Sequence, residues 1–264
     1  MQHRKSWIFT LLVACAWPSF AQAEACADYG PQAPRDIDRN NGASLVDYGP
    51  TPNTNQMNLC NIHLHKNAEH KASAYSLLSK DDSKDGIGGG YECALSKTLS
   101  SKELKKPRVN HCKNLQPGDT VEVHWVFTSC DVDPGPGLGS CLSDACANPT
   151  LKVEAQVYTL VNDKNAIDFM ELAYQGHKHN NRPHPKSLPD DTGMPVNYLG
   201  STTGPSYNAT TCSPLQVHWS VRPQCAKLDI NSLSQWCANN SFDEDGPHGV
   251  RKIVVNPSLL SPLR

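Results

Sequence analysis

Cysteine is the residue that most constrains how this chain folds, because eleven cysteines occur among its 264 residues. Residues 1–23 have the pattern of a cleaved secretory signal, with a basic start, a short apolar run and the small-residue ending AQA. Cys15 leaves with this signal, so ten cysteines remain in 24–264. An even number in an exported chain indicates up to five disulfides, whose pairing stays open. We therefore expect a secreted or periplasmic protein.

The charge and the hydropathy of the chain after residue 23 argue against two classes of partner. Without residues 1–23, the chain keeps 22 basic and 26 acidic residues, a formal net charge of −4. A nucleic-acid-binding domain carries a basic patch, so we expect no nucleic-acid partner. A membrane span takes about 20 apolar residues. No segment after the signal meets that requirement, and we expect no membrane partner either.

Alternation of apolar and polar residues predicts a protein that is rich in β-strands. It occurs in 57–65, 119–127, 151–161, 215–221 and 250–255. Helical patterns are weaker and are limited to 73–80 and 230–238. The segment 24–55 is rich in Pro, Asn and Asp, and we expect it to run over the surface. These patterns predict one β-rich domain, 24–264, with short helices and long loops held by disulfides.

Three histidines in two of these predicted strands indicate a metal site. His63 and His65 are two residues apart, so they point to the same face, roughly 6.5–7 Å apart along the strand. Two such imidazoles can share a metal ion if a neighbouring strand supplies a third ligand, and His124 is available in 119–127. Three neutral imidazoles around Zn²⁺ leave a fourth position for water, as in catalytic zinc sites. We predict zinc bound by these three histidines.

Two polar residues on the same predicted faces favour this interpretation over three unrelated histidines. A metal-bound imidazole usually donates its second N–H to a nearby acceptor. Asn61 precedes His63 by two residues, and Glu122 precedes His124 by two. Each acceptor therefore shares a face with its histidine and is expected to orient the ring.

The motifs around these histidines resemble those of carbonic anhydrases. "CNIHLHKNAEHKA" and "VEVHW", in a cysteine-rich exported chain, resemble the delta class. The His-x-His, Glu-His and Glu-x-His patterns are also similar to the zinc strands of the alpha class. The resemblance implies a mainly β (α+β) fold of alpha-carbonic-anhydrase type, with a central, largely antiparallel twisted sheet. It further implies reversible hydration of CO₂ to bicarbonate and a proton by zinc-bound hydroxide, with His63, His65 and His124 as zinc ligands.

A later segment, 198–221, resembles an alpha-class run in which Tyr-x-Gly-Ser-x-Thr-Thr-Pro precedes a strand with Trp. This resemblance implies that Thr202 accepts a hydrogen bond from the zinc-bound hydroxide and is oriented by Glu69. One residue of the alpha-class pattern is missing before Thr202, so Thr203 remains the alternative and would otherwise line the substrate pocket. The apolar wall for CO₂ is expected to include Val126 and Trp219.

Regeneration of hydroxide needs a proton carrier, and histidine titrates in the required pH range. The segment "GHKHNNRPH" supplies His177 and His179 as candidates, with a solvated polar loop as the simpler interpretation. We expect His70 to be structural and His248 to lie on the surface.

Two alternatives stay open at the level of sequence. The spacing of His63, His65 and Glu69 also fits the first motif of cupins, a β-rich fold in which Glu69 and His124 would complete the ligand set. The glycines that flank the cupin motifs are absent. The second alternative is a secreted zinc-binding protein without catalysis.

Overall fold

The computed structural model of the chain describes residues 26, 28–80, 89–203 and 211–264. The predicted signal, 1–23, lies outside the described residues. None of the helices in the described ranges is long and apolar enough to cross a membrane.

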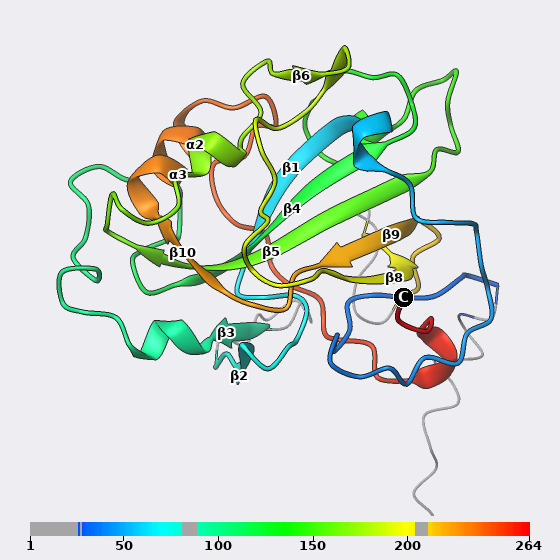
Figure 1. Cartoon of the computed structure of the whole chain (residues 1–264), viewed down its shortest axis with the longest axis horizontal. Helices are drawn as coiled ribbons and strands as arrows, with labels where there is room; N and C mark the ends of the chain where they lie inside the picture. The colour runs from blue at the N-terminus through cyan, green and yellow to red at the C-terminus, as the bar shows by residue number, and fades with distance from the viewer. Residues whose placement is uncertain (1–25, 27, 81–88, 204–210) are drawn as a thin grey trace, which may run out of the picture.

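The centre of the molecule is a mixed, twisted sheet with the strand order β1-β4-β5-β9-β8, which Figure 1 shows from one face. A further strand, β10, pairs with β5 beyond the end of β9. Three of the five pairings are antiparallel, and the two that join β5 to β9 and β10 are parallel. The strands are β1 Asn58–Lys66, β4 Thr120–Thr128, β5 Leu151–Val161, β8 Val196–Ser201, β9 Gln216–Val221 and β10 Ala226–Asp229.

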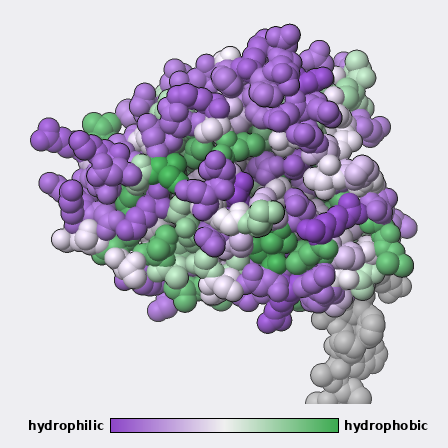
Figure 2. All heavy atoms as spheres, viewed as in Figure 1, coloured by the Kyte–Doolittle hydropathy of each residue, from purple (hydrophilic) through white to green (hydrophobic). Residues whose placement is uncertain are grey.

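Short elements surround this sheet and are joined by long loops. Two small hairpins are formed by β2 Tyr75–Leu78 with β3 Tyr91–Cys93, and by β6 Lys178–His179 with β7 Arg182–Pro183. The helices are α2 Phe169–Leu172 and α3 Ile230–Ala238, with 3₁₀ turns at Thr54–Gln56, Ala94–Lys97, Leu138–Cys141 and Pro257–Leu259. The prediction of a mainly β protein with short helices is confirmed. The face of the molecule drawn in Figure 2 is mostly hydrophilic, with apolar patches between the hydrophilic residues.

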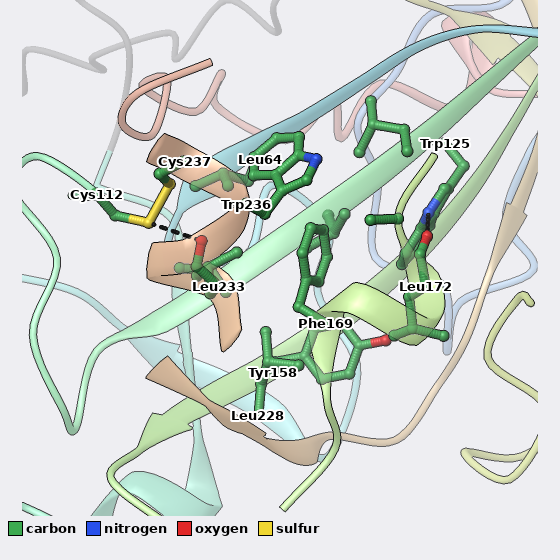
Figure 3. Close-up of a cluster of buried hydrophobic side chains, with 14 of the residues drawn as sticks. Leu64, Cys112, Trp125, Tyr158, Phe169, Leu172, Leu228, Leu233, Trp236 and Cys237 are labelled. Carbon is green, nitrogen blue, oxygen red and sulfur yellow. Dashed lines mark hydrogen bonds between the residues drawn. A yellow bond between two sulfur atoms is a disulfide. The ribbon is translucent and has the colours of Figure 1, made fainter. Parts of the chain in front are cut away.

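Each face of the sheet is covered by its own core, because strand residues alternate between the faces. On one face, α2 and α3 pack through Phe169, Leu233 and Trp236 onto β1, β4 and β5, as Figure 3 shows. Asp168 and Asp229 begin these helices by accepting hydrogen bonds from backbone N–H groups of the first turn. The opposite face carries Val153, Val157, Val217 and Trp219 together with the histidines of β1 and β4.

Five disulfides join ten of the eleven cysteines and hold the loops on this sheet. The pairs are Cys26–Cys212, Cys60–Cys141, Cys93–Cys225, Cys112–Cys237 and Cys130–Cys146. Four of them connect residues more than 80 positions apart, so each closes a long loop in the unfolded chain. Bridges of this kind typically stabilise a fold by about 2–5 kcal/mol. The expected disulfide framework is confirmed, and it indicates an oxidising compartment.

Several local predictions are right and others are wrong. The helix predicted at 230–238 is α3, and the strands predicted at 57–65, 119–127, 151–161 and 215–221 are β1, β4, β5 and β9. The helix predicted at 73–80 is wrong, because this segment pairs with β3 and forms β2. The strand predicted at 250–255 is also wrong. That segment is irregular, and Val254 donates its N–H to Pro34 instead of to a strand.

The segment 24–55 does not simply run over the surface as predicted. Its part 31–35 is buried, because it packs between β8 and the C-terminal segment. Arg35 is fully buried, donates to the carbonyl oxygen of Ser261 at 2.5 Å and lies 5.4 Å from the centre of the Tyr198 ring. Composition alone could not reveal a partner 226 residues away.

The alternation predicted for β1 holds only in its second half. A register shift between Leu59 and Asn61 places two residues opposite one on β4, as in a β-bulge. Leu59 therefore joins the helix-covered core with Ile62 and Leu64, instead of the face of Asn61. The shift leaves Asn61, His63 and His65 on a common face.

One buried histidine gives this fold a pH dependence. His218 of β9 is 1% exposed, and among the described residues neither ring nitrogen has a hydrogen-bond partner. Burial, together with the positive charges of Arg264 and Lys152, lowers the pKa of His218 to about 4. The ring is therefore neutral in the folded chain at neutral pH. Because the unfolded chain binds the proton more readily, the stability present above about pH 6.5 is lost as the pH falls toward 4.

Replacing His218 by leucine removes this dependence. We expect His218→Leu to be close to neutral for stability at pH 8, since no hydrogen bond is lost. At pH 4.5 the variant should gain about 2 kcal/mol over the wild type in the free energy of unfolding. Urea unfolding at both pH values measures this difference, with the exposed His111→Leu as a control. An equal shift in both variants, or none in His218→Leu, contradicts the assignment.

Candidate metal centre

The structure brings the three histidines predicted as ligands together. In the register of β1 and β4, His63 pairs with His124, and His65 pairs with Glu122. One nitrogen from each of the three rings lies within 4.8 Å of the other two. The Nε2 atom of His63 and the Nδ1 atom of His124 are 3.2 Å apart. We call these three residues the three-histidine cluster.

The second nitrogen of each ring is held by a separate acceptor. His63 Nδ1 lies 2.6 Å from Asn61 Oδ1, and His124 Nε2 lies 3.0 Å from Glu122 Oε1. His65 Nδ1 lies 2.8 Å from the carbonyl oxygen of Gly249. With these nitrogens protonated, Nε2 of His63 and His65 and Nδ1 of His124 are left as lone-pair donors facing one another. Such outer hydrogen bonds fix ring orientation in metal sites.

Glu122 is fully buried and accepts hydrogen bonds from three directions. Besides His124, its carboxylate accepts from the backbone N–H groups of Glu69 and His70, at 2.5 and 3.1 Å. These two donate to Oε2, and the Nδ1 atom of the His70 ring lies 2.6 Å from Oε1, the oxygen that His124 also contacts. Burial alone raises the pKa of Glu122, but the neighbouring His70 and His124 outweigh burial and hold this pKa well below its usual range. The carboxylate is therefore ionised and able to accept.

Burial also sets the charge state of the cluster itself. Desolvation lowers the pKa of His65 to about 4, and it lowers the pKa of His63 well below the usual value, with a further contribution from His124. Both rings are therefore neutral at neutral pH, which is the form that binds a metal ion.

Glu69 and the two threonines occupy different positions around this cluster. Glu69 is buried, with Oε2 3.9 Å from His65 Nε2 and 4.0 Å from His124 Nε2. Thr202 follows β8 and is buried, while Thr203 is partly exposed. The described residues show no hydrogen bond between Thr202 and Glu69, and the proposed orientation of one by the other stays a prediction.

The residues predicted to form an apolar wall lie on the same face of the sheet as the cluster. Val126 is two residues after His124 and fully buried. The ring of Trp219 lies 5.1 Å from that of His124 and 4.7 Å from that of His70, measured between ring centres. Its indole N–H donates to the carbonyl oxygen of Ser201, the residue before Thr202. Trp219 thus connects the cluster with the threonine segment.

The histidines predicted as proton carriers are not brought to the cluster by any described contact. His177 and His179 are exposed and lie in or next to the β6–β7 hairpin. His179 contacts His184, which packs on Phe127, a residue of the helix-covered face. Their role stays a prediction.

Sequence reasoning missed two residues of the site. The carbonyl of Gly249 is a backbone group 184 residues from His65, and no side chain signals it. His248 is exposed, as expected, but sequence did not predict that its ring centre lies 5.8 Å from that of His63 and 6.0 Å from that of His65. Its side chain is half exposed, and the hydrogen bond that it donates to the Glu244 carboxylate raises the pKa of His248. Only the fold brings this segment beside β1.

Comparison with known proteins identifies the family. The family model described as delta carbonic anhydrase matches residues 54–232, from the turn before β1 into α3. The chain belongs to the delta carbonic anhydrase family. It is a carbonic anhydrase, and this membership decides against the cupin and non-catalytic alternatives. The match includes the three-histidine cluster, Glu122 and Trp219, whereas His248 and Gly249 lie beyond it.

The similarity of the chain to individual known proteins is low. No curated protein matches the chain. A hyperthermostable carbonic anhydrase from an active hydrothermal vent chimney is 13% identical, with a TM-score of 0.35 over 92% of this chain and 90% of that one. The alpha-carbonic anhydrase of Thermovibrio ammonificans in complex with the inhibitor sulfanilamide is 14% identical, with a TM-score of 0.33 over 88% and 90%.

The contacts of Glu122 predict its effect on metal binding. Glu122→Gln keeps the shape of the side chain but replaces an ionised acceptor that His124 and His70 share. We expect the affinity for Zn²⁺ to fall about 10–100-fold, as for other residues that orient metal ligands. Competition with a chromophoric chelator measures the affinity. Glu92→Gln, on the edge of the β2–β3 hairpin, is the control, and equal affinities in both variants contradict this role.

Proposed function

We propose that residues 24–264 form one catalytic domain of a zinc-dependent carbonic anhydrase that is secreted or periplasmic. Its reaction is the reversible hydration of CO₂ to bicarbonate and a proton. Family membership supports the reaction, and the five disulfides support an oxidising compartment. The proposal is carried by one observation, the convergence of three imidazole nitrogens from β1 and β4.

The donor set fits Zn²⁺. Nitrogen from neutral imidazole suits zinc, and three protein ligands are usual for a catalytic zinc site. All ten mature cysteines are used in disulfides, so the residues left to bind the ion are histidines and carboxylates. His63, His65 and His124 would hold the ion, with Asn61, Gly249 and Glu122 as the acceptors behind them.

When bound, zinc lowers the pKa of a coordinated water to about 7 and so supplies a nucleophile at neutral pH. The residues of the chain provide the surroundings for this chemistry. Val126 and Trp219 offer an apolar surface beside His124, which suits CO₂ because that molecule has no net charge or dipole. Glu122 keeps the His124 ring oriented through an ionised, fully buried acceptor.

In this proposal the Thr202 hydroxyl accepts a hydrogen bond from the nucleophile, which would leave a lone pair of that oxygen directed at CO₂. Its backbone is held in place, since its N–H donates to Leu215 and its carbonyl accepts from the Ser213 hydroxyl. Glu69 is the carboxylate nearest to the cluster after Glu122. We propose that it accepts a hydrogen bond from the Thr202 hydroxyl.

Metal removal tests the proposed function directly. The purified chain should contain about one zinc per molecule by mass spectrometry of its metals. Treatment with a chelator should reduce CO₂ hydration in a stopped-flow assay to the uncatalysed rate, and added Zn²⁺ should restore it. His124→Ala should lose both zinc and activity. Full activity in the metal-free chain, or bound zinc without any hydration, contradicts the proposal.

The two threonines are separated by a matched pair of variants. Thr202→Ala should lower kcat/KM for CO₂ about 100-fold or more, since removing one positioned hydrogen-bonding group at a reacting oxygen costs about 10²–10³-fold. Thr203→Ala should change it less than about threefold, because this residue would only line the pocket. Both should keep their zinc. The reverse order of effects assigns the role to Thr203 instead.

A further inference from the structure

A cavity of about 390 Å³ lies against the opposite face of the sheet, behind the three-histidine cluster. Trp125, which follows His124 in β4, forms part of its wall, and so does Glu154, the register partner of Trp125 in β5. Successive residues of a strand point to opposite faces, so this cavity and the cluster are separated by the sheet itself. The reaction proposed above makes no use of the cavity.

The cavity has an apolar side that comes mainly from loops. Pro52 lies in the segment before β1, and Leu188, Pro189 and Pro195 lie in the segment between β7 and β8. Figure 1 shows that the latter segment crosses in front of the sheet. Together with Trp125, these residues form an apolar wall large enough for the body of a small organic molecule.

A buried ammonium group forms part of the polar side. Lys152 is only 9% exposed, which is rare for lysine. Its Nζ atom lies 2.8 Å from Glu154 Oε1 and 3.3 Å from the carbonyl oxygen of Pro52. An ammonium group has three N–H donors, so one remains for a ligand in the cavity.

Arg222, Ser220 and Asn197 add further donors to the polar side. Arg222 donates to the carbonyl oxygen of Gly193 at 2.8 Å, and in the described part of the chain no carboxylate forms an ion pair with it. The Ser220 hydroxyl and the Asn197 side-chain amide make no hydrogen bond within the described ranges. Since Glu154 balances the charge of Lys152, Arg222 leaves the cavity with one excess positive charge.

We propose that this cavity binds a small organic monocarboxylate. Its carboxylate would accept from Lys152 and Arg222, the latter by the two-pronged geometry that guanidinium offers to carboxylates. Ser220 and Asn197 add neutral donors, and the apolar body would lie on the prolines and Leu188. An inorganic anion would leave this apolar wall uncovered, and a cation would meet the excess positive charge.

Benzoate is a suitable probe, and calorimetric titration of the mature, metal-loaded chain at constant ionic strength measures its binding. We expect saturable binding to the wild type. Lys152→Met and Arg222→Gln should each weaken it about 10–100-fold, the loss expected for one hydrogen bond to a charged group. The exposed Lys164→Met, with the same change of charge, should bind as the wild type does.

The metal centre is a second place where benzoate could bind, and the same samples separate the two sites. Lys152→Met should hydrate CO₂ at the wild-type rate, because Lys152 lies outside the proposed catalytic site. Benzoate affinity that is equal in Lys152→Met, Arg222→Gln and wild type places the ligand elsewhere and overturns the proposal, whatever the outcome of the zinc experiments.

A loop variant keeps the test valid if the change at Lys152 disturbs the fold. Leu188→Trp fills the apolar side from a loop and should weaken benzoate binding as well. Acetate, which lacks an apolar body, should bind several-fold more weakly than benzoate. Sulfate binding as tight as that of benzoate, or binding of benzoate that does not saturate, overturns the assignment to an organic carboxylate.

Discussion

The buried carboxylate of Glu122 is the interaction on which the architecture of the metal centre depends. An ionised group without solvent contact is costly unless donors surround it, and removing one donor leaves an uncompensated charge. Here the donors come from β4 itself and from the turn after β1, through His124, His70 and two backbone N–H groups. His70 extends the arrangement to β8, because its second ring nitrogen lies 2.6 Å from the hydroxyl of Tyr198. One carboxylate thereby fixes three separate parts of the sheet relative to one another.

This arrangement gives different roles to the neighbouring residues Glu69 and His70. The turn that carries them begins at Asn67, whose φ of 66° is a conformation that asparagine adopts more readily than most residues. Its backbone N–H donates to Thr120 at the start of β4, which holds the turn against that strand. As a result the His70 ring faces Glu122 in the interior, while the Glu69 carboxylate faces the three-histidine cluster. The backbone N–H groups of Glu69 and His70, which belong to this turn, donate to the Glu122 carboxylate.

Sequence predicted the parts of the fold and of the site whose cause is local. A period of two residues identified four of the strands, and the common face of His63 and His65 follows directly from it. Sequence was insufficient to predict the features that depend on long-range contacts. The segment 73–80 has helical composition, but pairing with β3 makes it a strand. Likewise, the acceptor for His65 is a carbonyl from a segment that only the folded chain brings beside β1. The bulge at Leu59 shows the same limit within a single strand, because it reverses a phase that simple alternation assigns.

The two faces of the sheet are linked by the strands they share. His124 and Trp125 are consecutive in β4. A backbone shift that moved Trp125 in the wall of the cavity on the opposite face would therefore also move the His124 ring relative to Glu122. The packing around Trp125 opposes such a shift: its indole N–H donates to the carbonyl of Leu172, and its ring lies within the core formed by α2 and α3. Protein cores are close-packed, so they transmit small displacements instead of absorbing them. The helix-covered core therefore does more than stabilise the fold, because it holds β4 in the position from which His124 reaches the other two histidines.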